Sequence, residues 1–173
     1  APAPELAAAL ARRNEARLAQ EVSRLEGLAN ITCITQPEPL GLGHAVSLAR
    51  QAVAGEPFAV ILPDDLIDYP DSGLRQMLPV FEEHQASVIA VETVDGQETR
   101  KYGVIRPTRV SERVYKVEEL VEKPEPDQAP SHLSIVGRYI LTPAIFEALA
   151  KTAPDKKGEI QLTDALSLLL KEQ

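Results

Sequence analysis

The sequence predicts an α/β domain built on a mostly parallel sheet with helices on both faces. Segments that fit strands alternate with segments that fit helices along most of the chain, which is the pattern of such domains. Some strand segments, such as residues 58–62, are uniformly apolar, as expected where a parallel sheet is covered on both faces. The 173 residues, 44% of them hydrophobic and 25% charged, are enough for one buried core.

The first part of the chain predicts an N-terminal helical segment, a strand, a helix and a second strand. Leucine and valine recur at helical spacing between residues 5 and 28, so residues 1–28 are expected to be helical with one apolar stripe. A short β-branched run at residues 31–35 predicts a strand, which two prolines then end because proline lacks a backbone donor. Apolar spacing predicts a helix over residues 43–54, before the strand at 58–62.

The remaining elements continue the alternation, and residues 29–173 are expected to form the main domain. The apolar patterns predict helices and strands in the order helix 74–84, strands 86–94, 102–106, 114–121 and 131–141, and helices 143–151 and 163–171.

The charge balance argues against a nucleic-acid partner. Eighteen basic and 26 acidic residues give a net charge of -8, the wrong sign for binding a phosphate backbone. The net charge does not exclude small anions as ligands, because a metal ion and one lysine can create a local positive site on an acidic protein. Apolar runs are too short to cross a bilayer and no secretion signal is evident, so we expect no membrane partner and a cytoplasmic setting.

Cysteine and histidine usage argues against two kinds of site. Cys33 is the only cysteine, so no disulfide framework or cysteine-rich zinc site can form. His44, His84 and His132 show no i,i+4 pairing, so we expect them to be helix or loop residues rather than metal ligands.

Polar side chains follow three of the predicted strands. The three segments that carry them are the loop at residues 36–43, the pair Asp64 and Asp65, and the pair Glu122 and Lys123. Ligands of α/β sheets sit beyond the carboxyl ends of the strands, so these three segments are the candidate site.

The loop combines the Gln36 amide with two glycines directly before a helix. An amide donates and accepts, which suits the edge of a pyrimidine base, and glycine lets a planar ligand approach the backbone. A plain strand-to-helix turn, in which glycine supplies positive φ, explains the same residues.

The charged candidates also allow two interpretations. Asp64 at the end of an apolar strand suits a magnesium ion shared with substrate phosphates, or it caps the next segment or faces solvent. The Glu122 carboxylate can accept from sugar hydroxyls and the Lys123 ammonium can neutralise a phosphate, or the two form a surface ion pair.

Six short motifs occur in an order that resembles bacterial UTP-glucose-1-phosphate uridylyltransferases, within the sugar nucleotidyltransferase superfamily. The motifs are 36–45 (QPEPLGLGHA), 62–65 (LPDD), 102–104 (YGV), 121–124 (VEKP), 136–139 (VGRY) and 158–165 (GEIQLTDA). Each is weak alone, but six in order cover nearly everything from residue 29 onward. The resemblance implies a Rossmann-like, three-layer α/β/α fold with a mostly parallel mixed sheet, of the nucleotide-diphospho-sugar transferase type.

The resemblance also implies roles for individual residues around one nucleotide sugar. Gln36 and the backbone of Gly41 would bind uracil, and Asp64 would bind the magnesium that bridges the phosphates. Gly103 and Glu122 would hold glucose hydroxyls. Lys123 would contact the sugar phosphate, and the backbone near Val136 would line the sugar pocket. Asp64 and Lys123 are the residues with catalytic roles, and residues 159–164 receive no specific role.

The implied reaction makes UDP-glucose and pyrophosphate from UTP and glucose-1-phosphate. It requires alignment and charge neutralisation rather than a protein nucleophile. The 173 residues lack the glycine-rich, basic segment that wraps the triphosphate in this family, and also its second metal-binding aspartate. We therefore expect these residues alone to show little or no transferase activity.

Two other functions remain open. The first is thymidylyl transfer to glucose-1-phosphate, because one glutamine and one glycine would tolerate either pyrimidine. The second is a non-catalytic module that binds sugar nucleotides or regulates. An absent first strand is also expected to leave an apolar edge beside residues 58–62, so pairing with another copy into a homo-oligomer is an option.

Overall fold

The chain forms two compact units, Ala1–Thr35 and Gln36–Gln173. The structure is a computed structural model and describes residues 4–25, 28–68 and 70–172. The sequence places the division after residue 28, whereas the structure places it after Thr35.

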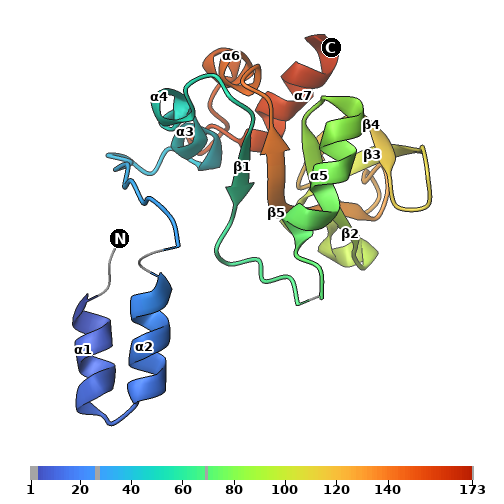
Figure 1. The fold of residues 1–173 in the computed structure, drawn as a ribbon. Helices are drawn as coiled ribbons and strands as arrows, with labels where there is room; N and C mark the ends of the chain where they lie inside the picture. Colours follow the sequence, from blue (N-terminus) through green and yellow to red (C-terminus); the bar gives the residue numbers. More distant parts are fainter. Residues whose placement is uncertain (1–3, 26–27, 69, 173) are drawn as a thin grey trace. The chain divides into compact units, whose positions relative to one another are not determined.

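The N-terminal unit contains two helices, α1 (Pro4–Arg12) and α2 (Ala16–Leu25), which pack side by side (Figure 1). The prediction of one continuous helix between residues 5 and 28 is therefore wrong. The chain turns at Asn14, which has φ 58, in the left-handed region. Asparagine tolerates this conformation better than most residues, so a helix with regular apolar spacing can still end there.

The strand predicted at residues 31–35 is also wrong. Residues 30–36 have no regular secondary structure, and Ile31 and Ile34 are exposed. A strand needs a neighbour for its ladder of hydrogen bonds, and none of the described strands pairs with this segment.

The C-terminal unit contains the other predicted elements. Its helices are α3 (Leu42–Ser47), α4 (Arg50–Val53), α5 (Gly73–His84), α6 (Ile145–Lys151) and α7 (Leu162–Glu172), with a short 3-10 helix at Gly96–Lys101. Its strands are β1 (Phe58–Ile61), β2 (Val88–Thr93), β3 (Gly103–Arg109), β4 (Tyr115–Glu122) and β5 (Leu133–Leu141). The predicted helix at residues 43–54 is thus split in two, and the others are confirmed within a few residues. Every helix in the described parts of the chain is too short or too polar to traverse a bilayer.

β5 pairs with β1, β2 and β3, β4 pairs with β3, and every pairing among the described strands is antiparallel. Tyr139 of β5 lies opposite Val60 of β1 and also opposite Ile89 of β2, so β5 separates these two strands. β1 and β2 run in the same direction but are not neighbours. The α/β fold class is confirmed, but the mostly parallel pairing is wrong among these strands, because a strand of opposite direction fills the place between β1 and β2.

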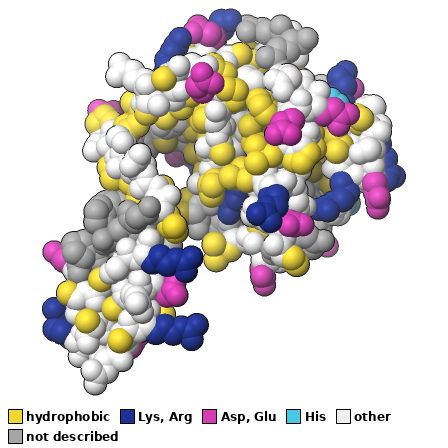
Figure 2. Space-filling model, in the orientation of Figure 1, with side chains coloured by type: hydrophobic (Ala, Val, Ile, Leu, Met, Phe, Trp, Pro, Cys, Tyr) yellow, Lys and Arg dark blue, Asp and Glu magenta, His cyan; other side chains and the backbone are white. Residues whose placement is uncertain are grey.

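β1 is less covered than its apolar sequence suggests. Phe58 and Val60 are half-buried, whereas Ala59 and Ile61 are exposed. Among the described strands, β1 pairs only with β5. Hydrophobic side chains are accordingly visible on the surface of this unit (Figure 2).

Helices cover both faces of β5, as a three-layer arrangement requires (Figure 1). Ile135, Tyr139 and Leu141 face the main core, which includes residues of α6 and α7. Arg138 points to the opposite face, where its side chain lies beside Gly73 at the start of α5. The alternation of β5 side chains therefore holds the two helical layers on the sheet.

We predict that Leu141→Ala destabilises the chain far more than Leu78→Ala. Leu141 is 0% exposed in the core, whereas Leu78 on α5 is 48% exposed. Truncating the buried leucine should lower the free energy of unfolding by about 2–5 kcal/mol, and the exposed one by well under about 1 kcal/mol. Urea unfolding followed by circular dichroism measures both, and similar losses for the two variants would contradict the placement of the core.

Candidate functional site

The loop that precedes α3 is held against the backbone of Ile160. The Ile160 N–H donates to the Leu40 carbonyl at 2.8 Å, and the Gly43 N–H donates to the Ile160 carbonyl at 2.8 Å. A Cβ atom on Gly41 would lie 2.8 Å from that carbonyl oxygen, and one on Gly43 would lie 2.7 Å from it. Gly41 also has φ 91. Both glycines are therefore required by a close backbone approach, and Gly41 by its conformation as well.

The Gln36 side chain folds back onto this loop. Its Nε2 donates to the Gly41 carbonyl at 3.2 Å and lies 3.0 Å from Nδ1 of His44. Gln36 and Gly41, the two residues predicted to bind the base, are thus brought together.

The adjoining ends of β3 and β4 bring three further predicted residues together. Gly103 lies directly opposite Glu122, and the Lys123 N–H donates to the Tyr102 carbonyl at 3.0 Å. The Lys123 ammonium pairs with the Glu122 carboxylate at 3.2 Å. Lys123 has φ 46, an uncommon conformation for a residue other than glycine, and such conformations are often found at functional sites.

The first turn of α7 packs against these strand ends. A Cβ atom on Gly103 would lie 3.0 Å from Oγ1 of Thr163, so the helix and the strand approach closely here. Partial burial raises the pKa of the Asp164 carboxyl, and the nearby carboxylates of Glu122 and Asp155 raise it further. Ser167 of α7 also donates to the Leu120 carbonyl of β4 at 3.0 Å.

Tyr139 of β5 is close enough to two of the candidate segments for their charges to act on its phenol. Its side chain is buried, and burial raises the pKa of its phenol to about 12, with smaller contributions from the negative charges of Glu122 and Asp65. Tyr139 is therefore within electrostatic range of both the sugar-binding candidate Glu122 and the pair of aspartates.

The two aspartates after β1 have different surroundings. Asp65 accepts a hydrogen bond from the Gly137 N–H at 2.7 Å, and Arg138 donates to the backbone carbonyls of Leu62 and Asp65. Asp64 is exposed, and no hydrogen bond or ion pair involves its carboxylate among the described residues. Asp65 thus anchors the loop to β5, while Asp64 is available to a ligand.

The described residues hold no group of three or more histidine, cysteine or acidic side chains arranged for a metal ion. A magnesium ion at Asp64 would therefore need further oxygen ligands, and substrate phosphates or water commonly supply them. A single exposed carboxylate after a strand fits that kind of site.

Residues 159–164 contact both groups of candidates. Ile160 holds the loop that carries Gly41, Thr163 lies beside Gly103, and Asp164 is within electrostatic range of Glu122. Residues 159–164, for which no role was predicted, thus join the base-binding candidates to the sugar-binding candidates.

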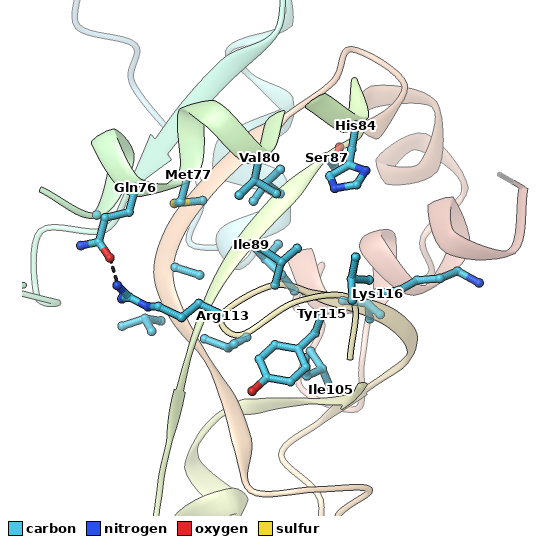
Figure 3. A pocket seen from close by; sticks show the side chains of 18 of the residues that line it. Gln76, Met77, Val80, His84, Ser87, Ile89, Ile105, Arg113, Tyr115 and Lys116 are labelled. Atoms are coloured by element: carbon cyan, nitrogen blue, oxygen red, sulfur yellow. Dashed lines mark hydrogen bonds between the residues drawn. The ribbon is translucent and has the colours of Figure 1, made fainter. Parts of the chain in front are cut away.

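A cavity of about 790 Å³ lies elsewhere, between α5, β2 and the β3–β4 hairpin (Figure 3). Its wall is mainly apolar, with Met77, Val80, Ile89 and Ile105 pointing into it, and Arg113 donates to the Gln76 side chain at 2.7 Å. Of the predicted site residues, only Val136 lines it. Val136 therefore contributes to the wall of this cavity, and its backbone is the part that the prediction assigns to a sugar pocket.

Sequence reasoning missed the supporting residues of the site. Arg138 and Tyr139 belong to the motif at residues 136–139, but nothing in the sequence tells which face of β5 each one occupies. The contact between His44 and Gln36 could have been suspected from their presence in one glycine-containing loop.

Comparison with known proteins supports the family resemblance that the six sequence motifs indicate. The sequence model of the family described as Nucleotidyl transferase matches residues 3–173. UTP–glucose-1-phosphate uridylyltransferase 2 of Staphylococcus saprophyticus is 44% identical over 165 residues, which are 95% of this chain and 57% of that protein. The UTP–glucose-1-phosphate uridylyltransferase of Bacillus subtilis is 44% identical over 96% of this chain and 57% of its own length. The chain thus spans little more than half the length of these relatives.

Solved structures give a consistent result. A UDP-glucose pyrophosphorylase complexed with UDP-glucose superposes with a TM-score of 0.88 at 41% identity, covering 92% of this chain and 62% of that one. A UTP-bound UGPase from Acinetobacter baumannii superposes with a TM-score of 0.78 at 35% identity, covering 96% of this chain and 59% of that one.

We predict that Gly41→Ala costs more stability than Gly55→Ala. Both glycines have positive φ, 91 and 86, but a Cβ atom at Gly55 would meet nothing within 4 Å. Gly41→Ala should therefore lose about 1–3 kcal/mol more, because its methyl group meets the Ile160 backbone. Thermal or urea unfolding measures the difference, and equal losses would show that the backbone contact at Ile160 is not formed.

The pKa of Asp155 predicts a pH-dependent contribution to stability. The Asp155 pKa is lowered from 3.8, chiefly by the hydrogen bond from the Glu159 N–H and then by that from Gln161. A lowered pKa in the folded state contributes stability above pH 3.8, and that stability is lost as the pH falls through the folded value. Asp155→Asn should therefore be less stable than the parent at about pH 6, and the difference should shrink as the pH falls below 3.8.

Urea unfolding over this pH range measures the effect. The matched control is Asp127→Asn, because Asp127 is exposed and no hydrogen bond to its carboxylate is formed among the described residues. A difference for Asp155→Asn that stays constant with pH would contradict the assignment of its cause.

Proposed function

Because the chain belongs to the nucleotidyl transferase family, we propose that it is the part of a UTP-glucose-1-phosphate uridylyltransferase that holds the two ends of UDP-glucose. The chain spans about 57% of the length of such relatives, so the activity is proposed for the whole protein. The observation that carries the proposal is the joining of the base-binding and sugar-binding candidates by residues 159–164.

The reaction proposed is an in-line displacement. A phosphate oxygen of glucose-1-phosphate forms a bond to the α-phosphorus of UTP, the bond from that phosphorus to the bridging oxygen breaks, and pyrophosphate leaves with the electron pair. The two reactants are both anions, so catalysis consists of holding them in line and neutralising their charge.

The chain would bind the base and the sugar with different residues. Gln36 and the Gly41 backbone would bind uracil at the loop held by Ile160. Glu122 would accept hydrogen bonds from glucose hydroxyls, with the backbones of Gly103 and Val136 lining the same pocket. The register that places Gly103 opposite Glu122 supports this arrangement, because it brings the two residues to the same end of the β3–β4 pair.

Two residues would act on phosphate charge. The Lys123 ammonium, held beside Glu122 at 3.2 Å, would neutralise the phosphate of the sugar. Asp64 would hold a magnesium ion, whose chemistry is to neutralise phosphate oxygens and keep them in line. Asp65, by fixing the loop to Gly137, would keep Asp64 directed outward.

The proposal extends to the setting of the protein. A sugar-phosphate substrate implies a place in carbohydrate metabolism. A cytoplasmic location, assembly into a homo-oligomer and the magnesium requirement remain predictions.

We predict that Glu122→Gln weakens binding of UDP-glucose but not of UDP. Only the glucose moiety meets Glu122 in the proposed arrangement, so the affinity for UDP-glucose should fall by about tenfold while that for UDP stays the same. Isothermal titration calorimetry of the 173-residue chain with both ligands measures the two affinities.

The matched control is Glu119→Gln on the same strand, where the carboxylate pairs with Arg106 at the surface. Glu119→Gln should leave both affinities unchanged. The proposed function is contradicted if the chain binds neither ligand, or if Glu122→Gln weakens UDP and UDP-glucose equally.

A further inference from the structure

His44 is positioned to control which atoms Gln36 presents to a ligand. The two side chains meet through Nε2 of Gln36 and Nδ1 of His44, 3.0 Å apart, and both residues are half-buried. His44 lies in the first turn of α3, where its backbone carbonyl accepts from the Ser47 hydroxyl at 2.7 Å and from the Leu48 N–H. The imidazole thus comes from a fixed point on the helix.

The orientation of the Gln36 amide follows from the Gly41 carbonyl. That oxygen can only accept, and it already accepts from the Ala45 N–H at 3.2 Å within the helix start. The Gln36 atom that lies 3.2 Å from it must therefore be the Nε2 donor, because an oxygen at that place would face another oxygen.

The orientation of Gln36 in turn sets the state of His44. One hydrogen of Nε2 points to the Gly41 carbonyl, so the other points to His44. His44 can accept it only if Nδ1 carries no proton, which makes Nε2 of the imidazole the protonated nitrogen. Both hydrogens of the Gln36 amide are then used inside the protein, and only its Oε1 remains for a ligand.

We propose that His44 is a specificity-determining residue that fixes Gln36 as a pure hydrogen-bond acceptor, so that the loop selects bases with an N3–H group over cytosine. Uracil and thymine carry a hydrogen on N3, whereas N3 of cytosine is itself an acceptor and would face the Gln36 oxygen without a proton between them. The inference rests on the proposed function in one respect, that Gln36 meets the base. His44 acts through Gln36 and does not itself contact the ligand.

The state of the imidazole can be tested without any ligand. A long-range proton–nitrogen spectrum of the 173-residue chain should show His44 with an unprotonated Nδ1 and a protonated Nε2. His44→Asn should keep the hydrogen-bonded Gln36 amide signals, because its Oδ1 replaces Nδ1 as acceptor, whereas His44→Leu should lose them. A protonated Nδ1, or Gln36 signals that are the same in all three proteins, would overturn the inference.

Base selection is tested with uridine 5′-monophosphate and cytidine 5′-monophosphate as probes. The parent chain should bind the uridine nucleotide more tightly, and His44→Leu should reduce the ratio of the two affinities by about tenfold. His44→Asn should retain the ratio within about threefold. An unchanged ratio in His44→Leu would overturn the role of His44, while equal losses in both variants would indicate a steric role and overturn it as well.

The two tests separate this inference from the proposed function. If the chain binds neither nucleotide, the assignment of the loop to a base is wrong, and His44 has no part in base selection. If the uridine nucleotide binds but the ratio does not respond to His44, the proposed function stands and only the inference is lost.

Discussion

The backbone contact between Ile160 and residues 40–43 is the constraint on which the candidate site depends. Ile160 donates to one residue of the loop and accepts from another, so the two segments are fixed in position and in direction. The contact leaves no space for a side chain at Gly41 or Gly43. A loop held this firmly keeps its carbonyl and amide groups in place before a ligand arrives, which reduces the entropy lost on binding.

Residues 159–164 also connect this loop to the sugar-binding candidates at the ends of β3 and β4. Two residues beyond Ile160, the chain enters α7, whose first turn packs against the ends of β3 and β4. β5 provides a second connection, because Gly137 holds the loop of the aspartates while Tyr139 lies within electrostatic range of both Asp65 and Glu122. The candidate segments, distant in sequence, are therefore connected through shared neighbours. Residues 159–164 contact both the loop of Gly41 and the end of β3 at Gly103, and β5 holds the loop of the aspartates.

The sequence allowed most of the C-terminal unit to be predicted, because its helices and strands carry strong apolar periodicity. Periodicity reports local structure only, which explains the errors. The helix predicted over residues 5–28 ignored Asn14, a residue that readily takes the left-handed conformation found there. Residues 31–35 have the composition of a strand, but a strand forms only beside a partner. The parallel sheet was inferred from the alternation of elements, which says nothing about a later strand, β5, entering between β1 and β2.

Only part of the candidate site could be predicted from the sequence. Four candidates stand out by residue type and by their motifs. In the structure they form two separate pairs, Gln36 with Gly41 and Glu122 with Lys123. The supporting contacts of Ile160, His44, Asp65 and Tyr139 depend on which backbone faces which, and this is a tertiary property. The predicted metal ligand Asp64 differs from Asp65 in tertiary contacts, because Asp65 accepts a hydrogen bond from Gly137 and Asp64 is exposed.

The central claim is that one nucleotide sugar occupies both ends of this site at once. Titration of the isotope-labelled chain with UDP-glucose, followed through backbone amide signals, tests it most directly. The account predicts that signals from Gly41 and from Gly103 shift together, with one common dissociation constant. Shifts confined to one of these glycines, or two different dissociation constants, would contradict it.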